Sequence, residues 1–500
     1  MTVAGLARGD RADDLEPSAR ALAHHAAWNY CALVFQLGGS LALVALAFRQ
    51  LPASDVGIFA LTSVTVGLVQ ILDPAAGFVM SRVVAERDIG RTDNDRVVAE
   101  LRAGLRAVAC ALGGIAAVGV TLAWLLRVPG AEGGRLVMIA GVALATCLQL
   151  ATASLPAIAV GIGDYRALCG SSAVTAVATL ACAWVLLPKM GIATLGIALL
   201  AGQVLGRGLL HILLGGQARS IPAASPSPKA ALAVLWSRSG SIYLSTLAAQ
   251  LLSVSDLWTV GALRGTESTA AYRGGSMIPT QASALFYRVY DVLYPRLPRI
   301  VEHQRQERAI ALATRTFCAA AGCMFTALFL ERVPLTHLLV GRTDLLTVRV
   351  FALFCAIWLV NVPVHGLALL LISRGQNRVM TPVVLAEAAI NIVVSIALVV
   401  LIGPIGAAVG TLATMAVSNL VVMPWVARKT VPGAMRATWA GAACCVLGIG
   451  AGTLLQAPAS ALLRGTAGVL AVAMAAVVSV VPAVWIAAGP EGRRILRAHV

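Results

Sequence analysis

Seven charged residues lie inside long apolar stretches of this sequence. They are Asp73, Arg207, Asp256, Arg288, Asp291, Arg315 and Glu387. A charge is costly inside a membrane, so such a residue usually faces a cavity, an ion pathway or a partner of opposite charge. A guanidinium can bind a phosphate through two parallel hydrogen bonds. These residues are therefore the first candidates for a binding site.

The three arginines are candidate ligands for a phosphate group. Arg207 lies deepest, roughly two turns inside its apolar segment, and no carboxylate is near it in the sequence. Arg288 precedes Asp291 by three residues, a spacing that also suits an ion pair on a helix, so both roles stay open. Arg315 lies about one turn, ~5 Å, from the end of its segment and is explained more simply by reaching to water.

The carboxylates Asp73, Asp256 and Glu387 have two interpretations. Each could bind a coupling ion, H+ or Na+, or it could be the counter-ion of an arginine, which is the simpler interpretation. Asp291 belongs to the same group of candidates. The sequence contains no HExxH, GxSxG, P-loop or zinc-binding spacing. We therefore expect no enzyme activity, no cofactor and no metal site.

The chain that must position these residues is strongly apolar. Hydrophobic residues make up 59% and charged residues 12% of it, and the mean hydropathy is +0.86. A soluble domain has roughly 45–50% apolar and about 25% charged residues. The net charge of +16 does not indicate nucleic-acid binding, because Lys and Arg are spread over short connectors without a basic stripe and interleaved aromatics. The composition predicts an all-α polytopic membrane protein.

The apolar runs predict about fourteen membrane-spanning helices, since a bilayer core needs about 20 residues per helix. The expected spans are 28–48, 56–80, 105–126, 136–162, 167–187, 192–214, 240–262, 272–294, 310–330, 350–373, 380–402, 406–427, 437–455 and 463–488. They form two six-helix bundles and two added helices. The predicted segments are a cytoplasmic start 1–27, a bundle 28–214, a cytoplasmic linker 215–239, a bundle 240–427, two additional helices in 428–488, and a cytoplasmic tail 489–500.

The distribution of Lys and Arg predicts the orientation. With the N-terminus in the cytoplasm, the inside segments hold 25 of these residues and the outside loops hold 10. Positive residues favour the cytoplasmic side of a membrane protein. We therefore expect both termini, and the Pro- and Ser-rich stretch Gln217–Arg238, to be cytoplasmic.

The two bundles look like copies of one unit. Leu51–Phe59 (LPASDVGIF) and Arg264–Tyr272 (RGTESTAAY) are short outside turns 213 residues apart. The later turns at Gly191 (GIATLGIA) and Gly403 (GPIGAAVG) are 212 residues apart. Two landmarks at nearly one spacing predict a duplicated six-helix unit. Many transporters are organised in this way, with the substrate path between the two halves.

The stretch Ala47–Glu86 resembles the opening hairpin of the Wzx-type polysaccharide flippases. These flippases belong to the multidrug/oligosaccharidyl-lipid/polysaccharide exporter superfamily. The matching features in the first half are Asp55-Val56-Gly57-Ile58-Phe59, Leu72-Asp73 and Ser81-Arg82. Those in the second half are Asp256, Ala271-Tyr272, Tyr294-Pro295 and the glycine turn at 403–410. The similarity lies in the order and spacing of these features over roughly residues 25–430.

This resemblance implies a flippase of the bacterial cytoplasmic membrane. It would move polyprenyl-(pyro)phosphate-linked oligosaccharide from the inner to the outer leaflet by alternating access. The implied partners are the lipid-linked oligosaccharide, membrane lipids, an H+ or Na+ coupling ion and the enzymes of envelope polysaccharide biosynthesis. A lipid II flippase and an ion-coupled drug antiporter of the same superfamily stay open. A polytopic glycosyltransferase is less favoured, because the first outside loop carries a single acidic residue.

Overall fold

The computed structural model describes residues 19–70, 77, 80–81, 84, 94–125, 133–215, 228–293, 302–374 and 376–462. Every element in this part of the chain is a helix. In chain order the elements are α1 (Ala19–Gln50), α2 (Ala53–Gln70), α4 (Asn94–Leu125), α5 (Gly133–Ala151), α6 (Ser154–Ile162), α7 (Tyr165–Met190), α8 (Ala193–Leu213), α10 (Pro228–Leu293), α11 (His303–Leu330), α12 (Arg332–Val340), α13 (Leu345–Ser373), α14 (Asn377–Ile402), α15 (Ile405–Val417), η3 (Ser418–Val422), α16 (Met423–Ala427) and α17 (Ala434–Leu462).

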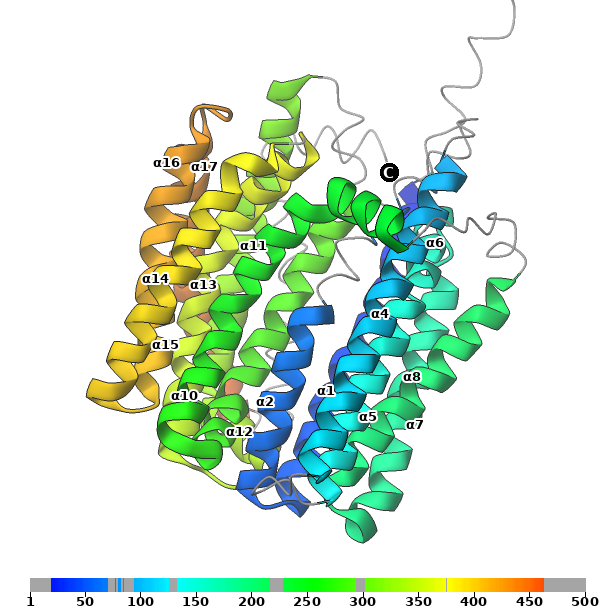
Figure 1. Cartoon of the computed structure of the whole chain (residues 1–500). Helices are drawn as coiled ribbons and strands as arrows, with labels where there is room; N and C mark the ends of the chain where they lie inside the picture. The colour runs from blue at the N-terminus through cyan, green and yellow to red at the C-terminus, as the bar shows by residue number, and fades with distance from the viewer. Residues whose placement is uncertain are drawn as a thin grey trace, which may run out of the picture.

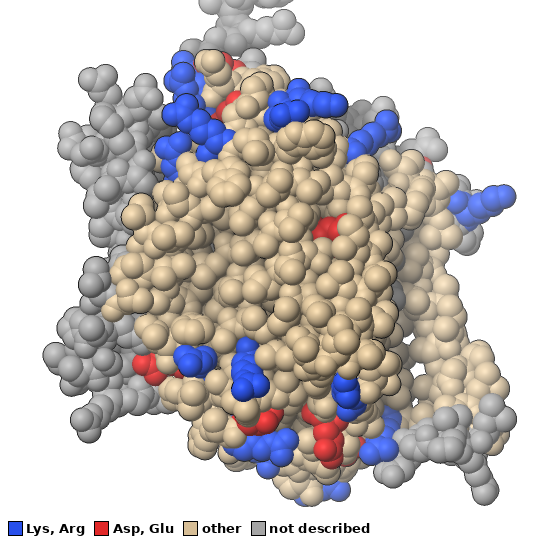
Figure 2. Space-filling view, turned by 90° about the vertical axis from the view of Figure 1, so that its left-hand side faces the viewer, with Lys and Arg blue, Asp and Glu red and all other residues tan. Residues whose placement is uncertain are grey.

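Nine helices in the described part are long and apolar enough to cross a membrane. Figure 2 shows how charge is arranged on one face: Lys and Arg gather towards the two ends, and the belt between them is almost free of charge. Large apolar side chains such as Val393, Leu401 and Leu447 are exposed, as expected where lipid covers the surface. The prediction of an all-helical, multi-pass membrane protein is confirmed. The predicted span 463–488 lies outside the described residues, so the count of fourteen stays a prediction.

The helices run between two ends, which we name by their place in Figure 1. At the lower end α1 passes into α2, α7 into α8, and α14 into α15. The upper end holds the starts of α4, α7 and α11. Figure 1 shows α1 and α4–α8 together on the right; with α2 they form the first group. Helices α10–α17 lie on the left and form the second group, except that the start of α10 crosses the upper end and packs against α4. Helix α2 packs against α10, where the two groups meet.

Some predicted spans have internal breaks that the apolar pattern did not indicate. The span 136–162 is divided into α5 and α6. The spans 240–262 and 272–294, in contrast, are predicted separately; they are the two limbs of α10, and the bend at Gly265, with φ 82° and ψ 173°, falls in the turn predicted between them. Glycine is the residue that adopts such a backbone conformation readily. The span 406–427 consists of α15, the π-helical turn η3 and α16.

Within each group, helices come close where small residues meet. Gly141 of α5 lies against Gly196 of α8, and Gly322 of α11 lies against Gly448 of α17. A Cβ atom at Gly141 or Gly322 would overlap the backbone of the neighbouring helix. Such crossings allow extensive van der Waals contact, which holds helices together in a membrane without a hydrophobic driving force.

The two groups are in contact at the lower end and, above it, along part of α2. Gly57 of α2 lies so close to Thr266 of α10 that any side chain at position 57 would overlap the Thr266 carbonyl. Trp258 of α10 donates a hydrogen bond of 3.0 Å to the hydroxyl of Thr65 on α2. Arg49 of α1 donates to a backbone carbonyl of α12 at 3.0 Å. The structure is therefore closed between the groups at the lower end.

Candidate functional site

Asp256, in the first limb of α10, is the centre of a fully buried polar cluster. Its Oδ2 accepts hydrogen bonds from the hydroxyls of Tyr272 at 2.8 Å and Thr411 at 2.7 Å. Its Oδ1 accepts from the hydroxyl of Ser395 at 3.1 Å and, at 3.5 Å, from the amide of Asn391. We call these five residues the Asp256 cluster. They come from both limbs of α10, from α14 and from α15.

The local sequence explains how these side chains meet. Asn391 and Ser395 are four residues apart on α14 and therefore share one face of the helix. After α14 the chain reverses at Gly403, whose φ of 81° suits glycine. Helix α15 then returns along α14, and Gly410 brings it close: a Cβ atom at Gly410 would lie 3.0 Å from Ser395 Oγ. Thr411 is consequently held beside Asp256.

The Asp256 cluster joins a carboxylate to neutral groups. Among the described residues, no Lys, Arg or His pairs with Asp256. Burial of a carboxylate is costly unless hydrogen bonds or a cation compensate for its lost hydration. Hydroxyl and amide oxygens also carry lone pairs, and hard cations take oxygen ligands. The cluster is therefore suited to hold a proton or a small cation. No group of three or more His, Cys, Asp and Glu in the described residues could hold a metal ion.

Glu387 lies one helical turn before Asn391 on the same face of α14. It is only 6% exposed. Its Oε2 accepts a hydrogen bond of 2.7 Å from Ser418, whereas its buried Oε1 has no hydrogen-bond partner. Ser418 is the first residue of the π-helical turn, a deviation that is frequent at functional sites. Glu387, Asn391 and Ser395 thus form a polar stripe that extends from the Asp256 cluster towards the upper end.

Arg273, in the second limb of α10, lies on the face between the two groups. It follows Ala270 by three residues and precedes Met277 by four, so the three share one side of the helix. Ala270 and Met277 are buried in a core cluster with Leu43 of α1 and Val56 of α2. Arg273 is half-buried, and its guanidinium makes no hydrogen bond or ion pair with the described residues. This side chain is a cation available to a ligand between the groups.

Arg207, the deepest charge in the sequence, lies on α8 and is half-buried. Its Nε donates to Gln203 at 3.4 Å, one turn earlier on the same helix. Helix α8 packs against α5, α6 and α7. Helix α7 fills the space beside the neighbouring Gly206, because a Cβ atom at Gly206 would overlap the hydroxyl of Thr175. The small residue beside Arg207 therefore serves helix packing.

The remaining predicted residues are scattered. Arg315 is exposed on α11, in the second group, so the structure does not bring it together with Arg207. The side chains of Arg288 and Asp291, and the whole of Asp73, lie outside the described residues. Of the predicted candidates, Asp256 and Glu387 are the pair that the structure brings close, through Asn391 between them.

Arg273 and the neutral members of the Asp256 cluster are not among the site residues predicted from the sequence. Arg273 is the second residue of the predicted span 272–294, so the sequence assigns its charge to the preceding outside loop and not to the membrane interior. The structure starts the second limb of α10 directly after Gly265, which places Arg273 about two turns inside. A signal for the neutral residues exists: Asn391 and Ser395 follow Glu387 at intervals of four in an apolar run.

Comparison with solved structures identifies the fold. No family model and no curated protein matches the sequence. A MOP superfamily transporter from Pyrococcus furiosus matches with a TM-score of 0.59 at 13% identity, over 83% of this chain and 96% of its own. The lipid II flippase MurJ, in an inward closed conformation, gives 0.61 at 12% identity over 95% of this chain and 100% of its own. The fold is that of the MOP superfamily transporters.

A multidrug resistance MATE family transporter of the MOP superfamily, in its outward-facing conformation, is also similar. It gives a TM-score of 0.60 at 13% identity, over 83% of this chain and 96% of its own. The likeness to the superfamily expected from the sequence is thus confirmed at the level of the fold. The narrower assignment to the polysaccharide flippases stays a prediction.

Proposed function

We propose that this MOP-type protein is a flippase for polyprenyl-(pyro)phosphate-linked oligosaccharide. It moves the substrate from the inner to the outer leaflet of the bacterial cytoplasmic membrane by alternating access. The observation that carries the proposal is Arg273, a cation without a partner in the described residues on the face of α10 between the two groups. The match to the lipid II flippase over 95% of the chain, against 83% for the MATE transporter, supports the same conclusion.

The chemistry of Arg273 favours a phosphate-bearing substrate over a cationic drug. A guanidinium is always charged and presents parallel donors that fit phosphate oxygens. In a low-dielectric interior it repels a cation, so it acts against the substrates of a drug/cation antiporter. A lipid II flippase has the same phosphate chemistry and remains the alternative within this class.

The Asp256 cluster and Glu387 supply the proposed coupling site. Both carboxylates are buried, and the unbonded Oε1 of Glu387 leaves an acceptor for an incoming H+ or Na+. With the predicted orientation, the upper end faces the cytoplasm and the lower end faces the outside. Release of substrate to the outer leaflet then requires separation of Gly57 from Thr266 and of Trp258 from Thr65.

Replacement of Arg273 tests the proposal. In cells that lack the native protein, Arg273→Ala should leave lipid-linked oligosaccharide on the inner leaflet while its synthesis continues, and Arg273→Lys should retain part of the transport. The matched control is Arg342→Ala, which removes an exposed arginine in the connection between α12 and α13. Leaflet exposure is measured with a membrane-impermeant probe for the sugar.

Two outcomes would contradict the flippase. One is full transport by a normally expressed Arg273→Ala protein. The other is an unchanged glycolipid distribution together with altered dye efflux, which would favour the antiporter. Purified protein should also transfer no sugar from a lipid-phosphate donor, whereas efficient transfer would support the glycosyltransferase.

A further inference from the structure

A cavity of about 220 Å³ lies between α11, α13 and α17 at the upper end. Three arginines line it: Arg308 and Arg315 of α11 and Arg436 of α17. None of these guanidiniums makes a hydrogen bond or ion pair with another described residue. Arg308 and Arg315 are seven residues apart, which is about two turns, so they lie on one side of α11. The cavity therefore carries unpaired positive charge.

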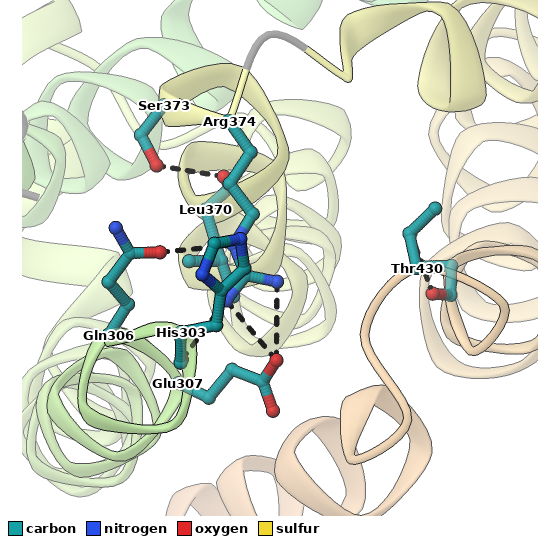
Figure 3. Close-up of polar contacts among 8 residues, drawn as sticks. His303, Gln306, Glu307, Leu370, Ser373, Arg374 and Thr430 are labelled. Atoms are coloured by element: carbon teal, nitrogen blue, oxygen red, sulfur yellow. Dashed lines mark hydrogen bonds and ion pairs between the residues drawn. The ribbon is translucent and has the colours of Figure 1, made fainter. Parts of the chain in front are cut away.

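The acidic residue that lines this cavity does not cancel that charge. Glu307 is held by Arg374, which directly follows α13 and whose guanidinium lies 3.2 Å from Glu307 Oε1. Arg374 also donates to Gln306 Oε1 and to the backbone carbonyl of His303, both at 3.1 Å. Figure 3 shows the Arg374 guanidinium between these groups. Glu307 is thus neutralised within the wall, and the three arginines remain for a ligand.

A buried hydroxyl marks the inner part of the cavity. Thr438 of α17 lines it and is only 1% exposed, yet its Oγ1 has no hydrogen-bond partner. Buried polar groups in folded proteins nearly always have a partner, so an exception indicates a missing one. A hydroxyl can donate to a phosphate oxygen. The neighbouring lining is apolar and includes Pro363, Leu367 and Leu370 of α13.

We infer that this cavity binds the phosphate of an anionic membrane lipid. The arginines and Thr438 bind the phosphate oxygens, and the apolar wall of α13 contacts the start of an acyl chain. A soluble anion would use the arginines but not this wall. The site is separate from Arg273, which lies on the face between the two groups, so it does not depend on the proposed transport activity.

Native mass spectrometry of the full-length protein in detergent tests the site with phosphatidylglycerol as the probe. The triple variant Arg308→Gln, Arg315→Gln, Arg436→Gln should bind the lipid at least about tenfold more weakly, because one hydrogen bond between charged groups is worth roughly that factor. The matched control is Arg305→Gln, on the same helix, whose side chain pairs with Glu302 at 2.6 Å. It should bind like the unchanged protein.

Thr438→Val provides a variant that is nearly isosteric and removes only the hydroxyl. Its melting temperature without lipid should equal or exceed that of the unchanged protein, because an unpartnered buried group is lost. The rise in melting temperature on addition of phosphatidylglycerol should be smaller than for the unchanged protein. This result supports the site even if the triple variant fails to fold.

Three results would overturn the inference. The first is equal binding of phosphatidylglycerol by the unchanged protein, the triple variant and Thr438→Val. The second is displacement of the lipid by inorganic phosphate at equal concentration, which would indicate a site for soluble anions. The third is much tighter binding of polyprenyl phosphate than of phosphatidylglycerol at the same residues, which would assign the cavity to the transported substrate.

Discussion

The hairpins α7–α8 and α14–α15 share one backbone arrangement but differ in the side chains between their helices. Each reverses at a glycine with positive φ, Gly191 or Gly403, whose N–H donates at 3.1 Å to a carbonyl four residues earlier. In the first hairpin Gly206 lies against Thr175, and in the second Ser418 bonds to Glu387. Gly206 and Ser418 are 212 residues apart, and so are Thr175 and Glu387, which is the spacing of the two glycine turns.

The difference lies in what fills the space between the helices. In α7–α8, Gly202 and Gly206 let the side chains of Thr179 and Thr175 approach the facing helix, so the two helices pack closely without a buried charge between them. In α14–α15, the corresponding space holds a carboxylate and a serine hydroxyl. The same backbone arrangement thus holds close-packed small residues in one half and buried polar groups in the other. This difference supports the proposed coupling role of Asp256, Glu387 and the second hairpin.

The largest effect is expected from Asp256→Asn, which removes the carboxylate of α10 that Asn391, Ser395 and Thr411 of the second hairpin contact. The side chain keeps its shape and the neighbouring hydroxyls can rotate to suit it, so the protein should fold. Transport in proteoliposomes should lose its dependence on a Na+ or H+ gradient and fall to the level of empty vesicles. The matched control is Thr179→Val, at the position of α7 that corresponds to Asn391. Unchanged ion dependence in Asp256→Asn would remove coupling from the cluster.

An intermediate effect is expected from Gly206→Val, which tests whether α7–α8 is held by close packing. The new side chain would overlap Thr175, and overpacking of this kind typically costs about 1–3 kcal/mol of folding stability. Thermal unfolding in detergent measures the loss. Gly208→Val is the matched control two residues away, because nothing lies within 4 Å of a Cβ atom there. Equal stability of the two variants would contradict the packing role.

The sequence predicted the helices well because membrane thickness sets their length. It also singles out Asp256 and Glu387, since a charge in an apolar run is conspicuous; both are buried, and their role as site residues stays a prediction. It could not find Tyr272 or Thr411 as their neighbours, because hydroxyl residues are common in membrane helices and usually bond their own backbone. Thr62 does so with a carbonyl one turn earlier. Which hydroxyl meets a carboxylate depends on the bend of α10 and the turn at Gly403.

Arg207 is harder to judge from sequence, since depth alone does not say what a charge faces. By the 212-residue spacing it takes the place of Asn419, which donates a hydrogen bond to Asn361 at 3.3 Å. This correspondence, and the bond from Arg207 to Gln203, give the side chain a place within its own group of helices. The face between the groups carries Arg273 instead. Arg207 is thus the residue at which sequence and structure give different expectations.

The smallest effect on transport is therefore expected from Arg207→Ala. If its role is confined to the first group, the variant should move lipid-linked oligosaccharide nearly as well as the unchanged protein, whereas Arg273→Ala should not. Arg207→Lys should then behave like Arg207→Ala. If Arg207 instead binds phosphate, Arg207→Ala would lose transport while Arg207→Lys keeps part of it, because the charge survives without the paired donors. The same leaflet-exposure measurement on all three variants decides which arginine the substrate meets.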